Sequence, residues 1–394
     1  MQMQKKHYFF DRASEEDEQK LCELFRRNPM PGAISLLYTR DPSFFASIAA
    51  MGKSSDIFVC RPYDNDNSND NRQEIVGVGV NSYLDMYVEG NIKELGYLHS
   101  LRFDKNHRGR GLILRAYNYF RDEIYLKKKS QIPFYLSTVI EDNLMFIKLL
   151  QCNRFPIPTY TDIGAYITYI ILADKPFKKT PSKYQNSSLI IRNIKNQDEL
   201  DKAIKFLNHE GSKKNFFPHY TKEDFLTLKN FEYQKHLYAI FLNDQEIIGT
   251  LGLWDQNSFK QTLVHSYDSK WKIIKPIYNF FSPLLRYKKL PNCGEKFSYY
   301  FNSFVATKDN DPELLSMLLK EVYRKSKNSN SNQNQNQNYH YSIIGLHEKD
   351  PLNQALKYFK TIKYRSRMYL VSYDEIDPTV LHSQKIPYLE CARI

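Results

Sequence analysis

Apolar and polar residues alternate in several stretches of the chain, and each stretch is rich in β-branched or aromatic residues. A period of two is typical of β-strands, because successive side chains point to opposite faces of a sheet. In the first half of the chain this pattern predicts five strands, at residues 56–60, 74–87, 94–103, 134–140 and 161–173.

A different period begins at Leu112. Apolar residues recur there at steps of three and four up to Ile124, which places them on one face of an amphipathic helix. A second helix is expected over residues 143–152. Strands that alternate with such helices predict an α/β fold, with a mixed α+β sheet and crossover helices.

The chain also repeats itself once. One short match between its halves could be chance, but several matches in the same order predict two copies of one domain. The second copy is expected to contain its own helices, over 200–207, 314–322 and 352–359. The matching segments are 74–77 with 246–249, 97–105 with 300–308 at an offset of 203, and 142–144 with 350–352.

Residues 176–188, which are polar and contain two prolines, are typical of a linker between the copies. We therefore predict an N-terminal domain over 1–175, a C-terminal domain over 189–376 and a tail over 377–394. Two tracts without apolar residues are predicted to be loops inside the copies, at 65–71 and 328–338.

One loop of the first copy has the composition of an anion site. Residues 106–112 (NHRGRGL) stand between a predicted strand and the helix that begins at Leu112. Gly109 and Gly111 allow a tight turn, and the amides that follow have no acceptor within the helix. Such a helix end favours a phosphate or pyrophosphate, and Arg108 and Arg110 add full positive charges. No Walker or Rossmann glycine pattern is present.

With these residues in place, the first half resembles the GNAT superfamily of acyltransferases, whose hallmark is R-x-x-G-x-[GA] after the fourth strand. Arg108 and Gly111 match this motif, whereas Ile113 stands where the family has glycine or alanine. The resemblance implies two tandem GNAT-like domains, each a splayed mixed β-sheet flanked by helices. It also implies acetyl-CoA as the acyl donor, held between the fourth and fifth strands.

Carried over position by position, the resemblance assigns a cofactor site in the first copy. The main chain at residues 101–103 would bind the pantetheine arm, and the loop before the helix would bind the pyrophosphate. An asparagine that is frequent in the family at the start of the next helix is also present. The residues implied are Leu101, Arg102, Phe103, Arg108, Gly109, Arg110, Gly111, Leu112 and Asn143.

Catalysis in this family often uses a glutamate base on the fourth strand and a tyrosine acid on a helix. Here Tyr97 stands at the glutamate position and Leu150 at the tyrosine position. His99 shares a strand face with Tyr97 and is the candidate base, because its free pKa lies near 6.5. Tyr160 is the candidate acid. The alternatives are a packed or hydrogen-bonded histidine and a core tyrosine.

The second copy lacks the arginines and glycines of the predicted anion site. At the offset of 203, Arg108 and Gly109 correspond to Asp311 and Pro312, and the next two positions hold glutamate and leucine. Carboxylates repel a phosphate, proline lacks an amide donor, and Asp311 is a good helix N-cap. We expect the second copy to keep the sheet without binding CoA, and to cover the first copy and shape an acceptor pocket.

Charge adds one further candidate surface. The chain has a net charge of +12; the first 180 residues carry 25 basic and 22 acidic groups, and the rest carry 31 and 22. Residues 270–289 (KWKIIKPIYNFFSPLLRYKK) hold six basic residues and no acidic one. They could be helices packed across the domain interface with lysines outward, a docking site for an anionic membrane or a nucleic acid, or an acceptor-binding flap. Pro276 and Pro283 are expected to break any long helix.

The remaining composition excludes several classes. A hydrophobic content of 42% and a charged content of 25% over 394 residues exclude general disorder. The five cysteines form no C-x-x-C pair, so neither a disulfide framework nor a metal site is predicted. No secretory signal is readable, and the longest apolar run, 163–173, is too short for a membrane span. We expect a cytoplasmic monomer.

Together these observations predict an acetyl-CoA-dependent N-acetyltransferase with one competent site, in the first copy. Its partners would be acyl-CoA and an amine of a small molecule or protein that the sequence does not identify. The alternative is a non-catalytic, CoA-responsive regulator or scaffold, because the usual acid and base are missing. Nucleic-acid and membrane binding are weaker possibilities; no nucleic-acid recognition motif is present.

Overall fold

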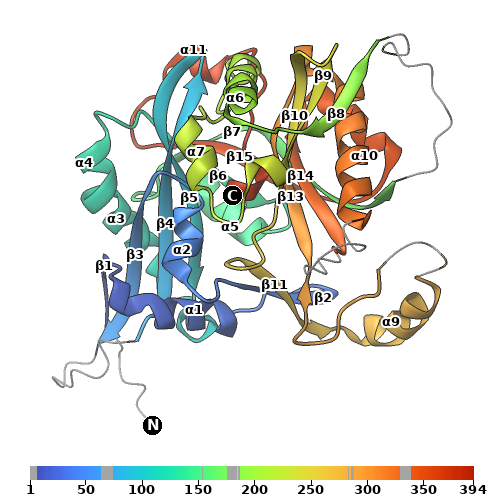
Figure 1. The fold of residues 1–394 in the computed structure, drawn as a ribbon. Helices are drawn as coiled ribbons and strands as arrows, with labels where there is room; N and C mark the ends of the chain where they lie inside the picture. Colours follow the sequence, from blue (N-terminus) through green and yellow to red (C-terminus); the bar gives the residue numbers. More distant parts are fainter. Residues whose placement is uncertain are drawn as a thin grey trace.

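The computed structural model describes residues 7–63, 74–152, 154–174, 184, 187–282, 284, 288–328 and 339–394. Two halves of similar architecture stand side by side around one large sheet that is flanked by helices (Figure 1). Most of the predicted linker 176–188, the insert 65–71 and all but the first residue of 328–338 lie outside the described residues.

The first half contains every strand that the alternation predicts, as β3 to β7. The predicted helix from Leu112 is α3, which continues through a π-helical stretch at Phe120–Tyr125. The elements are β1 (His7–Arg12), α1 (Glu18–Arg27), β2 (Ile34–Thr39), α2 (Phe44–Ala49), β3 (Ser54–Tyr63), β4 (Gly77–Val88), β5 (Asn91–Phe103), α3 (Leu112–Tyr119), α4 (Leu126–Lys128), β6 (Tyr135–Ile140), α5 (Leu144–Gln151) and β7 (Thr159–Asp174).

The second half repeats this order and adds a long insert between β11 and β13. The predicted helices at 200–207 and 314–322 are α6 and α10, whereas 352–359 forms a 3-10 helix at Pro351–Tyr358. The elements are β8 (Leu189–Asn193), α6 (Gln197–Gly211), α7 (Lys222–Thr227), α8 (Tyr233–His236), β9 (Leu237–Leu242), β10 (Glu246–Trp254), β11 (Gln261–Tyr267), α9 (Ser269–Phe281), β12 (Lys296–Phe297), β13 (Tyr299–Thr307), α10 (Pro312–Asn328), β14 (Tyr341–His347), β15 (Phe359–Ser372) and α11 (Pro378–Leu381).

The two halves exchange their last strands. The order in the twelve-stranded sheet is β1-β3-β4-β5-β6-β15-β7-β14-β13-β10-β9-β8. β15, from the second half, lies antiparallel between β6 and β7, and β7, from the first half, lies antiparallel between β15 and β14. Each half therefore has its last strand flanked by two strands of the other half. The mixed sheet with flanking helices is confirmed; the division into domains at 176–188 remains a prediction.

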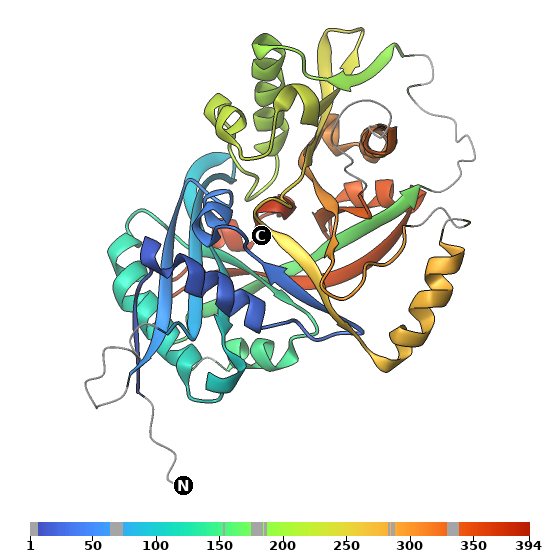
Figure 2. The same cartoon turned by 60° about the horizontal axis from the view of Figure 1, so that its bottom comes forward.

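A smaller sheet also joins the halves. β2 of the first half pairs with β11 of the second, and β12 covers the other side of β11. Thr39 Oγ1 donates to Gln261 Oε1 at 2.7 Å, and Gln261 Nε2 donates to the Asp41 carbonyl at 2.6 Å. In Figure 2 this sheet bridges the two halves below the C-terminus. It fixes the segment between α1 and α2 relative to the second half.

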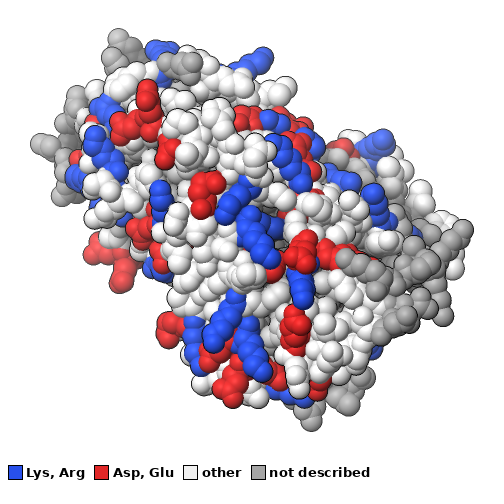
Figure 3. Space-filling model, turned by 90° about the horizontal axis from the view of Figure 1, so that it is seen from above, with Lys and Arg blue, Asp and Glu red and all other residues white. Residues whose placement is uncertain are grey.

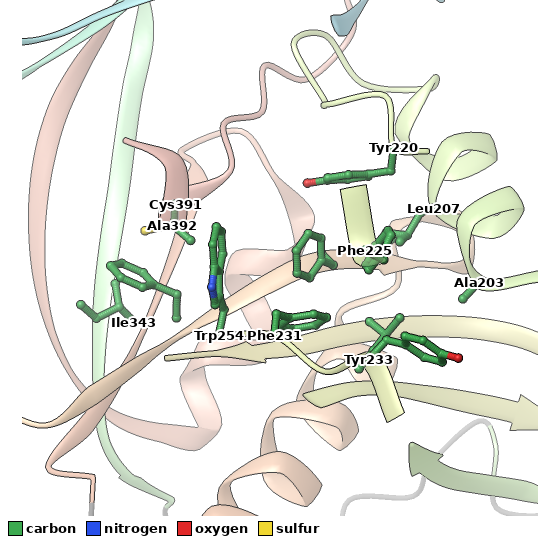
Figure 4. Packing of buried hydrophobic residues seen from close by; sticks show 14 of the residues in the cluster. Ala203, Leu207, Tyr220, Phe225, Phe231, Tyr233, Trp254, Ile343, Cys391 and Ala392 are labelled. Atoms are coloured by element: carbon green, nitrogen blue, oxygen red, sulfur yellow. The ribbon is translucent and has the colours of Figure 1, made fainter. Parts of the chain in front are cut away.

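The end of the tail, residues 388–393, is buried in the interior. Cys391 and Ala392 lie beside the fully buried Trp254, which belongs to a cluster of aromatic rings from α7, α8 and the sheet (Figure 4). Gln256 Nε2 donates to the Ala392 carbonyl at 2.8 Å, and the Tyr166 hydroxyl donates to the Leu389 carbonyl at 2.9 Å. These bonds connect the tail to both halves.

The basic insert differs from its structural prediction. Residues 269–281 form a single helix, α9, that continues through Pro276, and none of its residues is buried. The helix projects from the body of the molecule beside β11 (Figures 1 and 2). Lysines do point outward, but exposed apolar residues lie beside them, so the expectation of several helices packed across the domain interface is wrong. On the face seen from above in Figure 3, basic and acidic side chains are intermixed, and no continuous basic stripe is present there.

Candidate functional site

Strands β5 and β6 run parallel and separate toward their C-terminal ends. They pair only where Gly96–Leu98 faces Tyr135–Ser137, although β5 continues to Phe103 and β6 to Ile140. Beyond that point β5 stays with β4 and β6 stays with β15. The predicted splayed pair is therefore present, and the main chain of Leu101–Phe103 has no strand on its β6 side.

A β-bulge marks the point where the strands separate. Arg102 faces Val78 of β4 and His99 faces Val80, so two residues of β5 lie opposite Gly79. The first of them, Ser100, has a φ of 56°, which is uncommon for a residue with a side chain. Bulges re-aim the chain next to functional sites, and this one lies beside the predicted pantetheine-binding segment.

The second half contains an equivalent bulge. Its position changes the alignment of the two halves in this strand. In β13, Phe304 has a φ of 53°, and its bulge lies opposite Leu251 of β10. Ser100 therefore corresponds to Phe304, an offset of 204, whereas the short 3-10 helices at 105–107 and 308–310 correspond at 203. The alignment by sequence is therefore wrong by one residue in this strand. It matches Ser100, the first bulge residue of β5, with Ser303, which directly precedes the bulge of β13.

The loop between β5 and α3 is open and turns through two left-handed glycines. Gly109 and Gly111 have φ values of 77° and 70°, and no atom lies within 4 Å of where a Cβ would stand on either residue. Arg108 Nε donates to the Phe103 carbonyl at 3.2 Å, which holds the loop against the end of β5. The residue types that the sequence singled out are thus required by the backbone here.

The N-terminus of α3 has no protein cap. Gly111 is its N-cap residue and offers no side-chain acceptor. Among the described residues, no acceptor is recorded for the backbone N–H groups of 108–114. A row of such amides at the positive end of a helix favours the binding of an anionic group.

Three arginines surround this loop. Arg108 and Arg110 are exposed, and Arg102 packs over the Phe25 ring at 4.5 Å while its Nη1 donates to the Asn28 carbonyl at 3.3 Å. Burial, followed by the nearby charge of Arg108, lowers the pKa of Arg102. This concentration of positive charge adds to the helix dipole. Asn28 also accepts from the Lys105 amide at 3.2 Å, which ties the end of α1 to the loop.

The corresponding loop of the second half is shorter and is capped by its own carboxylate. One residue, Asp311, separates the 3-10 helix from α10, whereas four residues, 108–111, separate them in the first half. Asp311 Oδ1 accepts from the Glu313 amide at 2.9 Å, as predicted for an N-cap, and Oδ2 accepts from Tyr184 at 2.7 Å. A pocket of about 420 Å³ is present there, lined in part by Asp309 and Asp311. These carboxylates oppose phosphate binding.

The tail occupies the second bulge. Glu390 Oε2 accepts from the Phe304 amide at 3.0 Å, at the position equivalent to Ser100. The same oxygen accepts from the hydroxyls of Tyr388 at 3.1 Å and Tyr220 at 3.3 Å, and burial raises the pKa of Glu390. In the described part of the first half, no side chain accepts from the amides of Ser100 or Leu101. No motif in the tail indicates this role.

His99 is held by hydrogen bonds at both ring nitrogens. Nε2 lies 2.9 Å from Ser82 Oγ and Nδ1 lies 3.0 Å from Ser100 Oγ. Burial, together with the charges of Arg40 and Lys260, lowers the pKa of His99 to about 3. The ring stacks on Tyr97 at a centroid distance of 5.6 Å. His99 is therefore a neutral group at physiological pH.

The two tyrosines lie on opposite faces of the sheet. Tyr97 is buried on the side of the tail, and its hydroxyl lies 2.7 Å from Thr138 Oγ1. Tyr160 packs in the cluster under α3, with its hydroxyl 2.8 Å from that of Tyr117. Burial raises the pKa of both tyrosines, so both keep their protons at neutral pH.

The other predicted residues lie around the same strand pair. Leu112 is buried in the core under α3, so only its backbone can face a ligand. Asn143 is exposed and caps α5, with Oδ1 accepting from the Phe146 amide at 3.4 Å. Leu150 is buried in the core, as its apolar character requires.

Sequence reasoning missed two cations where the halves meet. Arg40 follows β2 and is only 7% exposed, and its Nε and Nη1 have no hydrogen-bond partner within the described part of the chain. Lys260 precedes β11, and its Nζ donates to the main-chain oxygen of Ile394 at 3.0 Å. Burial lowers the pKa of Arg40 to about 10 and that of Lys260 to about 7, and the charge of Arg40 acts on both Lys260 and His99. No local motif marks these residues, because only the β2–β11 pairing brings them together.

No metal centre is apparent in the described ranges, where no group of three or more His, Cys, Asp or Glu residues could hold an ion. No helix in those ranges is both long and apolar enough to cross a membrane.

Neither a family model nor a curated protein sequence matches this chain. Solved structures do. A structure of Saccharomyces cerevisiae N-myristoyltransferase with bound myristoyl-CoA matches 92% of this chain and 78% of its own, at 12% identity and a TM-score of 0.55. A second structure of that enzyme with myristoyl-CoA matches with a TM-score of 0.53 and 13% identity, over 92% of this chain and 82% of its own.

A third match is a GCN5-related glucosamine N-acetyltransferase region in a fungal multi-domain GH3 β-N-acetylglucosaminidase. It covers 93% of this chain at 12% identity and a TM-score of 0.54, and this chain spans 38% of that protein. Each match includes both halves of this chain. At these identities the likeness establishes the fold, which is the one that the glycine loop and the splayed strands indicated.

Proposed function

We propose that this chain, which has the GNAT fold, is an acyl-CoA-dependent N-acyltransferase with one competent site, in its first half, and that acetyl-CoA is its donor. The observation that carries this proposal is the uncapped helix end at Gly111, beside the unpaired edge of Leu101–Phe103. The main chain of this edge would align the pantetheine arm, and the loop 108–111 would hold the pyrophosphate. N-myristoyltransferase, of like fold, was solved with myristoyl-CoA bound, which supports an acyl-CoA ligand.

The second half would serve recognition rather than donor binding. Asp311 and Glu390 occupy the two amide sites that a second CoA would need. The segment after β2 and the start of β11 place Arg40 and Lys260 toward β5, where an acceptor would meet the thioester.

The reaction requires a neutral amine, a thioester carbonyl close to it, and a proton for the departing thiolate. As the amine nitrogen attacks the carbonyl carbon, the C–S bond breaks, the nitrogen loses a proton to water, and the departing thiolate takes up a proton. Tyr160 keeps its proton and would supply it from the α3 side of the sheet. The ring of His99 is neutral and is held by two serines. His99 would therefore orient the amine or a water, and would not act as the base that accepts the amine proton.

This view of His99 predicts the pH dependence. Because its pKa is about 3 in the folded chain, His99 does not change charge between pH 5 and pH 8. The pH profiles of kcat/KM for the wild type and for His99→Gln should therefore have the same shape. The variant should lower kcat by the same factor, about 10 to 100, at every pH. A rate profile of both proteins checks this. An inflection near pH 6.5 that disappears in His99→Gln would assign His99 as the base instead.

We further propose that the acceptor amine carries an anionic group. Arg40 and Lys260 are two cations in a desolvated region, and Arg40 has two N–H groups without an acceptor. Such groups cost free energy unless a ligand pairs with them. A carboxylate or phosphate on the acceptor would do so and would place its amine near β5.

Replacing Arg40 with glutamine is expected to raise the KM of an anionic acceptor about 10- to 100-fold, the usual range for one lost charged hydrogen bond. The Kd of acetyl-CoA should stay unchanged. Above about pH 7 the wild-type KM should also rise, because Lys260 loses its proton there. The measurement compares a carboxylate-bearing amine with its carboxamide. Equal losses for both acceptors would contradict the assignment.

Thiol release during incubation with acetyl-CoA and an amine library tests the enzyme function itself. Mass spectrometry of acetylated products from a cell lysate then identifies the acceptor. Binding of acetyl-CoA without turnover of any amine would favour the regulator alternative instead.

A further inference from the structure

Helix α9 presents apolar side chains to solvent in a regular row. Ile273, Ile277 and Phe280 follow the helical spacing i, i+4, i+7, and they are 71%, 57% and 79% exposed. Leu284, at i+11 and just beyond the helix, is 81% exposed. We call these four residues the α9 stripe. Isolated exposed apolar residues are ordinary, but a continuous row on one helix face marks an interaction site.

The orientation of the stripe is fixed by the other side of the helix. Trp271 packs against the core of the second half, and Lys275 Nζ donates to Asn292 Oδ1 at 2.8 Å. The side chain of Asn279 binds the main chain of Leu290 in the segment after the helix. Its Nδ2 donates to the Leu290 carbonyl at 3.2 Å, and its Oδ1 accepts from the Leu290 amide at 2.7 Å. The helix therefore cannot roll the stripe inward without breaking these contacts.

Every charged residue of α9 and of the segment that follows it is basic, and Asp268, the N-cap of the helix, is the acidic residue that precedes them. Residues 269–289 include six lysines and arginines and no acidic residue. Lys270, Lys272 and Lys289 are exposed. A basic helix with an aliphatic and aromatic face is the composition that settles in the interface of an anionic bilayer, where each cation near the surface contributes about 1 kcal/mol. Its 13 residues are too few to span.

We propose that α9 docks this protein on an anionic lipid surface, with the α9 stripe in the interface and the lysines at the headgroups. Charge complementarity favours this partner over a second copy, because two such helices would bring their lysines together. The aliphatic residues of the stripe favour it over a nucleic acid, whose backbone offers no apolar contact and whose bases stack on aromatic rings. This inference does not depend on the acyltransferase function.

Co-sedimentation of the full chain with vesicles tests the proposal. Binding to phosphatidylcholine vesicles with about 30% phosphatidylserine should exceed binding to pure phosphatidylcholine at least about 10-fold and fall with salt. The double variant Ile273→Glu, Phe280→Glu should lower the partition at least about 10-fold. Its matched control is Ile92→Glu, Ile362→Glu, which introduces the same charge at two other exposed apolar residues, 51% and 54% exposed, outside α9.

Equal melting temperatures of the two double variants would show that folding is intact. The proposal is overturned if the wild type binds neither vesicle, if it binds both equally, or if the control loses as much as the stripe variant. It is also overturned if the stripe variant changes only the oligomeric state or oligonucleotide binding.

Discussion

Replacing Arg108 with glutamate is expected to weaken acetyl-CoA binding about 100-fold. The change removes one charge-assisted bond to a phosphate, which is worth about 1.5–3 kcal/mol, and places a carboxylate beside the phosphate. Isothermal titration of wild type and variant measures the loss directly. Equal affinities, or no binding by either protein, would rule out the donor site.

Two further variants make this result specific. Arg108 also holds the Phe103 carbonyl, so Arg110→Glu, which changes the other exposed arginine of the loop, should give a loss of similar direction. Arg324→Glu applies the same charge change to an exposed residue of α10, which forms an ion pair with Glu321 on its own helix. It should leave the Kd of acetyl-CoA within about 2-fold of the wild type.

The second large effect concerns the exchanged strands. If the chain is divided within 176–183, the first half made alone should fail to fold. It would lack β15, which lies between β6 and β7, and β14, which pairs with the other side of β7. Met368 and Leu370 of β15, both 0% exposed, complete the core around Leu136. The expected loss exceeds about 5 kcal/mol, which is comparable to the whole stability of a domain.

Co-expression is the matched control for this experiment. The two halves produced together should associate, co-purify and bind acetyl-CoA, because the exchange needs no covalent connection. Circular dichroism and thermal unfolding of each preparation provide the measurement. A first half that is folded and binds acetyl-CoA alone would show that β15 is dispensable.

Local chemistry explains what the sequence could predict. The loop of Arg108, Gly109 and Gly111 could be recognised from local sequence alone. Glycine permits its left-handed turns, and the helix that follows leaves its first amides without intrahelical acceptors. Period-two alternation located β3 to β7 for the same reason. The N-cap at Asp311 was likewise legible from the residue type and its place before α10.

The parts that could not be predicted depend on contacts between distant residues. Nothing in the sequence of β15 shows that it lies between β6 and β7 rather than beside β14. Arg40 and Lys260 are 220 residues apart and meet only through the pairing of β2 with β11. His99 has an ordinary strand position, and its low pKa follows from burial and from these two cations. Glu390 lies in a tail that shows no periodicity.

We propose that, in the intact chain, acyl-CoA binds to the first half and not to the second, through backbone amides that have no acceptor among the described residues. Hydrogen–deuterium exchange of the full chain with and without acetyl-CoA tests it most directly. The account predicts slower exchange at residues 108–114 on addition of acetyl-CoA and no change at 309–315. Protection at 309–315, or none at 108–114 under saturating acetyl-CoA, would contradict it.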